Sequence, residues 1–346
     1  MATPWFGRVL AAARRVVVTA GEDFILEQLG TEHGVAAPAR ELAKGAEYMT
    51  IRVKTSRIVN VRRWTSTYYG CIQARTSYLH EKLGAVEFQT VVVPELMKHL
   101  DPRNLGQVIL VDRPIVGPVP YVGGVSLELG LFSVKGSDLA APYIELLTSL
   151  AEASGVSFFL RALPFVEPLR KGIDLLFGNA DQAQLEIGLD QSWETVRTGT
   201  WLLMRAPKGS VRTSQLRLDP DDHRLTDAQG RPFQSHPYVI FAIEGSAERD
   251  DWMLIPELNA AWDAIGGAAK RGDLNDAEQL LRSFELVCNW SADLIPSDAE
   301  RLVKKARSKL PGLQQGTGMA GLPAAEHPLG ELKDLDLYDH RESPES

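Results

Sequence analysis

The sequence predicts an α+β fold: a mostly antiparallel β-sheet or sandwich with an inserted helical pair, followed by a helical C-terminal subdomain. The first observation is a change of period. Apolar residues alternate up to Ser137, recur at helical spacing up to Gly178, and then alternate again. The second observation is that helical spacing alone continues after Gly245. An apolar content of 44% in 346 residues is enough for two compact units.

The strands are predicted from alternation and from β-branched runs. Between Val125 and Leu131 every second side chain is apolar and the others are small or polar, which is typical of a half-buried strand. Residues 107–112 form a short apolar run that fits a buried strand, and the prolines and glycines of segment 117–124 predict a turn after it. Further strands are expected near residues 51–54, 86–93, 184–189, 195–204, 215–218 and 238–243.

Two helices are expected inside this β-rich part, within residues 138–177. The first carries an apolar stripe from Leu139 to Leu150, and the second carries one from Leu169 to Phe177. Ser137 is placed to cap the first helix, because its hydroxyl can accept a main-chain N–H. The pair therefore interrupts the strands without ending the β-rich domain.

The chain is predicted to have four parts. Residues 1–47 are interpreted as N-terminal amphipathic helices, continuing through Glu22–Leu29, and a linker. Residues 48–244 form the β-rich core domain, and residues 245–310 form the helical subdomain. Within that subdomain three sequence signals place helix starts: Pro256 at a first helical position, and the capping-box spacings Asn275 with Glu278 and Ser297 with Glu300.

The fourth part, residues 311–346, is acidic. It carries seven acidic and two basic side chains, a net charge of −5 out of −8 for the whole chain. Because it has little apolar periodicity, we expect a disordered tail. Leu332, Leu335, Leu337 and Tyr338 lie among its acids, and they are interpreted as a segment that can dock on another protein. The N-terminal amphipathic helix is a second candidate for contact with a partner protein.

A basic and aromatic segment is the most distinctive surface in the sequence. From Tyr48 to His80 there is no acidic residue. Single-stranded nucleic acid binds to cations along its phosphates and to rings that stack on its bases, and an anionic membrane surface also attracts the cations. The alternative is an ordinary strand face whose cations meet solvent or acids elsewhere in the fold. The candidate binding residues are Arg52, Lys54, Arg57, Arg62, Arg63, Trp64, Tyr68, Tyr69 and Arg75.

Two small groups of residues suggest catalytic or metal chemistry. Cys71 and His80 lie nine residues apart, and a hairpin between them would give a thiol a neighbouring base. The alternative is a buried cysteine. Asp219, Asp221 and Asp222 offer oxygen ligands of the kind that calcium prefers. Their spacing departs from the twelve-residue calcium loop, so a turn is predicted there instead.

The motifs of common cofactor sites do not occur in the sequence. There is no phosphate-binding loop, dinucleotide fingerprint, zinc-binding helix, cysteine pair or nucleophile elbow, so no cofactor is predicted and an enzyme is not favoured. No run reaches the roughly 18–20 apolar residues of a membrane-spanning helix. Two distant cysteines give no disulfide framework, which indicates a reducing cytoplasm.

The function predicted first is therefore a non-enzymatic cytoplasmic protein-interaction module that acts within a larger assembly. Two alternatives stay open at this point. One is a protein that binds nucleic acid or anionic lipid through residues 48–80. The other is a hydrolase that uses Cys71 and His80, or a pair of carboxylates brought together from distant parts of the chain.

Overall fold

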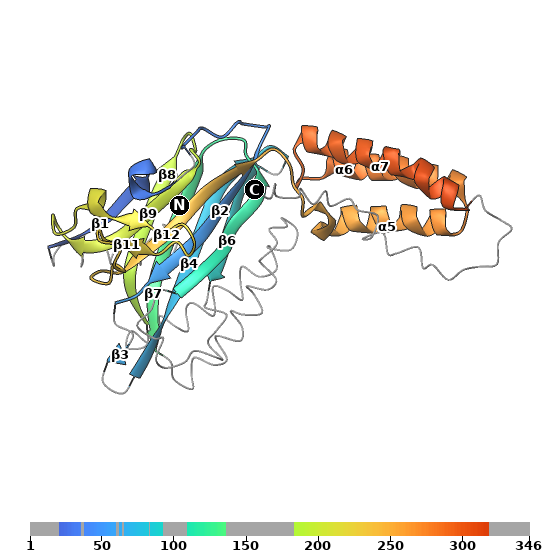
Figure 1. Cartoon of the computed structure of the whole chain (residues 1–346). Coiled ribbons are helices and arrows are strands. Elements are labelled where there is room, and N and C mark those ends of the chain that lie inside the picture. Colours follow the sequence, from blue (N-terminus) through green and yellow to red (C-terminus); the bar gives the residue numbers. More distant parts are fainter. Residues whose placement is uncertain are drawn as a thin grey trace. The chain divides into compact units, whose positions relative to one another are not determined.

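The computed structural model describes residues 21–35, 38–59, 62–63, 66–82, 84–92, 109–135 and 183–317. The chain divides into two compact units, with the boundary between Gly245 and Ser246. Among the described residues the first unit is built mainly of β-strands and the second of helices (Figure 1). The predicted α+β class with mostly antiparallel pairing is confirmed.

The described part of the first unit contains two five-stranded sheets. Its strands are β1 (Glu22–Leu29), β2 (Tyr48–Arg57), β3 (Arg62–Arg63), β4 (Ser66–His80), β5 (Gly84–Val92), β6 (Ile109–Pro120), β7 (Val125–Lys135), β8 (Ala183–Trp193), β9 (Gly199–Pro207), β10 (Arg217–Leu218), β11 (Leu225–Thr226) and β12 (Tyr238–Ser246). The first sheet has the order β1-β9-β12-β2-β6. In the second sheet β4 pairs with β3, β5 and β7, and β7 also pairs with β8. Strands β10 and β11 form a separate two-stranded pair.

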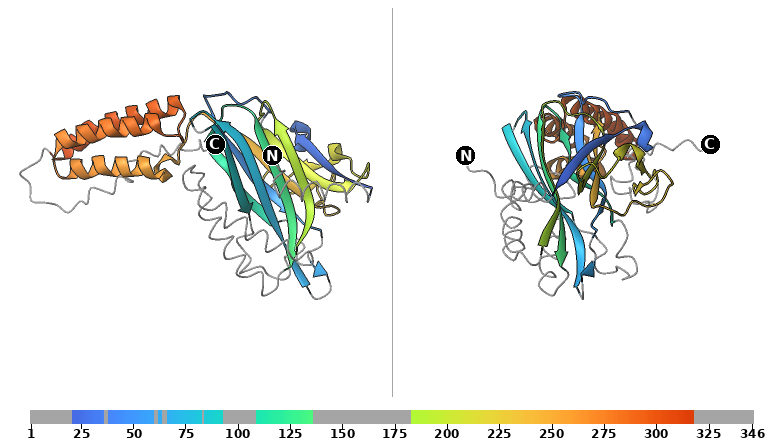
Figure 2. Two further views of the ribbon diagram at one scale, coloured as in Figure 1. Left: turned by 180° about the vertical axis from the view of Figure 1, so that it is seen from behind. Right: turned by 90° about the vertical axis from the view of Figure 1, so that its left-hand side faces the viewer.

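The two sheets lie face to face, as Figures 1 and 2 show. Side chains join them near two edges. The hydroxyl of Thr90 on β5 donates to the carbonyl of Ile115 on β6 at 2.8 Å. Arg205 on β9 donates to the carbonyl of Leu185 on β8 at 3.4 Å. The alternate leucines of β7 are completely buried, so the period of two predicted for this strand is confirmed.

The segment predicted as a turn at 117–124 is a strand as far as Pro120. Strand β6 contains three prolines, Pro114, Pro118 and Pro120. Strand β6 lies at the end of its sheet, and register shifts interrupt its pairing with β2. Proline has no N–H to donate, so it is tolerated at an edge strand or at an irregularity of the pairing. Gly117 has a φ of 91°, and a Cβ there would lie 2.2 Å from the Met49 carbonyl oxygen. Only glycine therefore fits this position.

The helix predicted over Glu22–Leu29 is wrong, because this segment is strand β1. It pairs antiparallel with β9 along its whole length, from Glu22 opposite Pro207 to Leu29 opposite Thr200. A short apolar run does not distinguish helix from strand by its period, and here the contact with β9 decides. Leu29 joins a buried cluster with Leu202 and other residues of the first sheet. The chain therefore enters the sheet well before residue 48.

Between Ser246 and Thr317 the second unit contains three helices and a short 3-10 turn. These are η6 (Trp252–Leu254), α5 (Pro256–Lys270), α6 (Leu274–Trp290) and α7 (Pro296–Thr317). The rings of Trp252, Trp262 and Phe284 pack against one another with centroids 5.6 to 6.0 Å apart. These aromatic side chains form the centre of the unit, and the predicted helical C-terminal subdomain is confirmed.

The helix ends correct two predictions. Pro256 opens α5, as expected. Helix α6 is capped by Asp273, whose carboxylate accepts the N–H of Asp276 at 3.0 Å, and not by Asn275. Helix α7 continues to Thr317, so it includes the first residues of the predicted tail.

Three further predictions lie outside the described residues. They are the N-terminal helix before Gly21, the helical pair at 138–177, and the acidic tail beyond Thr317.

A buried ionic network ties the ends of the helical unit together. The side chain of Arg249 is completely buried, and its guanidinium lies 2.6 Å from Asp251 and 3.4 Å from Asp293. The main-chain N–H of Arg249 donates to one carboxylate oxygen of Asp298 at 3.0 Å, and Arg301 contacts the other oxygen at 2.6 Å. The network therefore joins the segment before η6, the α6–α7 connection and the first turn of α7.

Replacing the buried cation tests this network. We expect Arg249→Met to lower the free energy of unfolding of the helical unit by about 3 to 5 kcal/mol, because Asp293 stays buried without its cation. Urea-induced unfolding measures the change. The control is Arg271→Met, because that exposed guanidinium lies 3.0 Å from Asp276 and such pairs contribute about 0 to 1 kcal/mol. Equal losses in both variants would contradict the role of Arg249.

The network also predicts a pH dependence. Burial raises the pKa of the Asp293 carboxyl from 3.8 to about 6, against the opposing effect of Arg249. Because the folded pKa is the higher one, this carboxyl adds stability that is full below pH 3.8 and is lost as the pH rises through 6. The side chain introduced by Asp293→Asn is neutral at every pH, so this variant should lack the pH-dependent contribution of the carboxyl to stability. The wild-type minus variant unfolding free energy should therefore rise by up to about 3 kcal/mol between pH 7 and pH 4. A constant difference would disprove the assignment.

Candidate interaction surface

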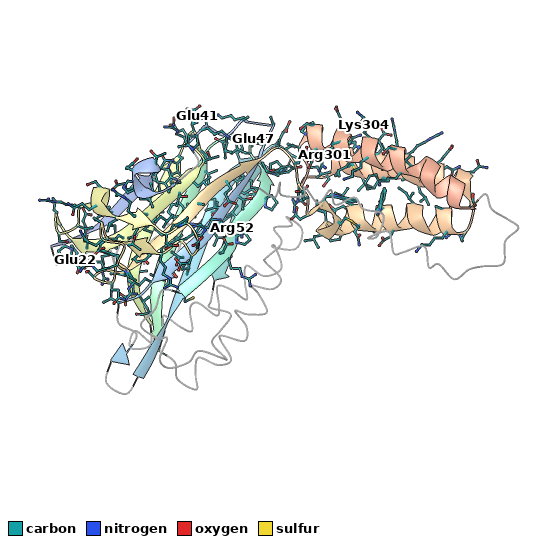
Figure 3. All side chains as sticks on the ribbon, viewed as in Figure 1. Glu22, Glu41, Glu47, Arg52, Arg301 and Lys304 are labelled. Atoms are coloured by element: carbon teal, nitrogen blue, oxygen red, sulfur yellow. The ribbon has the colours of Figure 1, made fainter. Side chains whose placement is uncertain are left out.

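Two of the predicted basic residues lie side by side on β2 and meet carboxylates. Lys54 Nζ is 2.9 Å from Glu244 on β12 and 3.3 Å from Asp112 on β6. Arg52, which Figure 3 labels, lies 3.6 Å from both carboxylates and donates to the Asp112 carbonyl at 3.1 Å. Two cations and two carboxylates thus form one balanced group across three strands. This group matches the alternative that the cations pair with acids elsewhere in the fold.

The other described cations of the segment are also engaged or buried. Arg75 on β4 belongs to the second sheet, where it pairs with Glu87 on β5 and lies 3.2 Å from Glu128 on β7. Arg57 is buried, and loss of water lowers the pKa of its guanidinium. The structure therefore does not gather Arg52, Lys54, Arg57 and Arg75 into one open cationic surface.

The rest of this segment is described only in part. For Arg62, Arg63, Tyr68 and Tyr69 the structure gives the course of β3 and β4, and Trp64 lies outside the described residues. Binding of nucleic acid or anionic lipid through these residues stays a prediction. It has no support from the four cations whose side chains are described.

The proposed thiol and base are far apart. Cys71 and His80 lie nine residues apart on the single strand β4, a separation of about 30 Å at 3.3 Å per residue. Burial raises the pKa of Cys71 to about 12, which disfavours the thiolate that a nucleophile needs. The Nδ1 atom of His80 accepts the N–H of Lys82 at 3.1 Å. The geometry of β4 therefore rules out direct contact between this thiol and this imidazole.

The aspartates of the β10–β11 connection organise a turn. One carboxylate oxygen of Asp219 accepts the N–H groups of Asp221 at 2.9 Å and Asp222 at 3.3 Å. Asp222 in turn accepts the N–H of Arg224 at 2.9 Å and contacts its guanidinium. In the part of the chain that the structure describes, no three or more His, Cys, Asp and Glu side chains are grouped to hold a metal ion. These contacts agree with the turn that the sequence predicts.

Large apolar side chains are exposed on α6. Leu286 is 61% exposed and Trp290 is 80% exposed. They are four residues apart, so they lie on one side of the helix. Phe284 and Cys288 are buried on the opposite side, toward the aromatic centre of the unit. We call Leu286 and Trp290 the α6 apolar face.

The buried network fixes the end of the unit where this face lies. Trp290 ends α6 three residues before Asp293, and the half-exposed Leu254 lies three residues after Asp251. Because Arg249 contacts both aspartates, the two exposed side chains belong to the same end of the helical unit.

A cationic stretch of α7 runs beside α6. Residues 301–309 contain five basic side chains and no acidic one. Arg307 pairs with Glu285, the residue next to Leu286, so the middle of this stretch lies level with Leu286. Figure 3 labels Arg301 and Lys304 in it, and Lys304 is exposed. The helix next to α6 thus carries a cationic stretch at the level of Leu286.

Sequence reasoning missed this face, although a signal for it was present. The start of the helix was predicted from the capping-box spacing of Asn275 with Glu278. Leu286 and Trp290 recur at the same spacing of four as Phe284 and Cys288, but half a turn away. A helix with large apolar residues on two opposite sides cannot bury both against one core. One of the two sides must remain exposed or meet another surface.

Comparisons of the chain with protein-family models, with curated proteins and with solved structures give no match. In the described residues no helix is long and apolar enough to cross a membrane.

The burial of the thiols predicts their reactivity. Burial raises the pKa of both Cys71 and Cys288 to about 12. Ellman's reagent should therefore react with the native chain at least about 100 times more slowly than with the denatured chain. A third thiol introduced by Ser283→Cys, at an exposed position of α6, is the control and should react rapidly. Rapid modification of Cys71 in the native chain would restore it as a reactive group.

Proposed function

We propose that the chain is a non-enzymatic protein-interaction module whose helical unit binds a partner protein through the α6 apolar face. The observation that carries the proposal is the exposure of Trp290, 80%, together with Leu286 one turn before it. Scattered exposed apolar side chains are ordinary, but a tryptophan and a leucine on one helical side form a contiguous patch. Tryptophan is enriched among the residues that contribute most to binding.

The surroundings of the face support the same reading. The three-helix unit has its own aromatic centre and its own ionic network, so Trp290 is not needed to complete the unit's core. The polar and charged side chains around the face suit the rim of an interface. A partner that covers the face and this rim would carry apolar anchors for Trp290 and acidic groups for the cations of α7.

The setting that we propose is the cytoplasm, within a larger assembly. Cys71 and Cys288 are both buried free thiols. Free thiols of this kind suit a reducing compartment, where no disulfide is required.

Serine substitutions in the face test the proposal. Full-length chain and the variant Leu286→Ser with Trp290→Ser are used to capture partners from a lysate, and each captured protein is then purified and titrated against both chains. We expect the dissociation constant of the partner to rise by about 30-fold or more, because loss of a central anchor costs at least about 2 kcal/mol. Thermal unfolding should change little, since the replaced side chains are exposed.

The matched control is Leu79→Ser. Leu79 is 59% exposed, close to the 61% of Leu286, but it lies on β4. A partner of the α6 apolar face should bind this variant with unchanged affinity. Partners that bind all three chains equally well, or no purified partner that binds the wild type directly, would refute the proposed function.

A further inference from the structure

The α6 apolar face is small for an interface between separate molecules. Stable interfaces bury about 800 Å² on each partner. The exposed parts of Leu286 and Trp290 provide on the order of 300 Å² together. Such a patch alone is suited to a segment that is already tethered nearby, because tethering gives an effective concentration on the order of millimolar.

The chain itself supplies a segment of matching chemistry. Residues 318–346 carry seven acidic and two basic side chains. Four large apolar residues, Leu332, Leu335, Leu337 and Tyr338, lie among these acids. The helix beside the α6 apolar face carries the opposite charge, because Arg307 of the cationic stretch 301–309 pairs with Glu285, the residue next to Leu286.

The length of chain after α7 permits the contact. Glu285 pairs with Arg307, so α6 and α7 run antiparallel and Leu286 lies level with the middle of α7. From there to Thr317 is about 17 Å along the helix, at 1.5 Å per residue. The fourteen residues between Thr317 and Leu332 can span up to about 50 Å. The apolar segment can therefore reach the face without strain.

We propose that Leu332–Tyr338 of the same chain binds the α6 apolar face and competes there with the partner protein. The apolar side chains of the segment cover Leu286 and Trp290, and its acids lie beside the cations of α7. This inference rests on the proposed function, because it assigns a regulator to the same surface. A partner then gains access only when the segment is displaced.

A photoreactive group beside the face tests the contact in the full-length chain. Ser283 is exposed and lies seven residues before Trp290, so it is on the same side of α6. We replace it by benzoylphenylalanine, irradiate the chain at low concentration, and identify the joined peptides by mass spectrometry. The expected product has the mass of one chain and joins α6 to a peptide that contains Leu332–Tyr338.

Two variants sharpen the test. Leu332→Ser with Leu335→Ser and Leu337→Ser should reduce this product by about tenfold, as expected for the loss of central apolar anchors. The control is Leu322→Ser with Leu329→Ser. These two leucines also follow α7 but precede Leu332, so they lie outside the proposed contact and the yield should be unchanged. The first variant should also bind the purified partner more tightly than the wild type does.

The remaining outcomes overturn the proposal. A product with the mass of two chains would assign the face to a second copy. A product elsewhere in the same chain, or equal yields from all variants, would show that Leu332–Tyr338 does not occupy the face. In each of these cases the proposed function is tested independently, by titrating the purified partner against the wild type and the variant Leu286→Ser with Trp290→Ser.

Discussion

The burial of one guanidinium determines the geometry of the helical unit. An arginine without exposure to water is stable only if several acceptors surround it, and those acceptors must come from whichever segments lie close. Here they come from Asp251 next to η6 and Asp293 after α6, while Asp298 of α7 accepts the main-chain N–H of Arg249. The same requirement places the last turn of α6 at this end of the unit. Trp290 is therefore held by a buried electrostatic constraint, although its own ring contributes little to the core.

The charges of the first unit follow a different rule. Its basic segment contains no acid between Tyr48 and His80, yet Arg52, Lys54 and Arg75 meet carboxylates that lie outside the segment. Lys54 meets Glu244, which lies 190 positions further along the chain, and Arg75 meets Glu128 in the neighbouring strand. Antiparallel pairing brings such residues together, so the charge of a segment does not give the charge of its surface. Local composition is a poor guide to anion binding in a sheet protein.

The fold could be predicted in large part from the sequence because its signals are local. Alternation identified β7, and Pro256 identified the start of α5. The errors arose where pairing with a strand that is distant in sequence determines the local structure. The segment Glu22–Leu29 is apolar enough for either state, and only pairing with β9 makes it a strand. The prolines of β6 read as a turn because its position at the end of the sheet is not visible in the sequence.

The candidate site was harder to predict, because α6 has two apolar sides and the sequence does not show which of them packs against the core of the unit. The exposed side also limits what can bind. Burying about 300 Å² at about 25 cal/mol per Å² gives a gross gain of about 7 kcal/mol, and association of two free molecules costs about 4 to 15 kcal/mol. For two free molecules, the gain from burying these two side chains is thus about equal to the cost of association. When the ligand is tethered, that cost is smaller and binding becomes favourable. A partner must therefore add contacts beyond Leu286 and Trp290. If the tethered segment covers the face nine-tenths of the time, the apparent affinity of that partner falls by about tenfold.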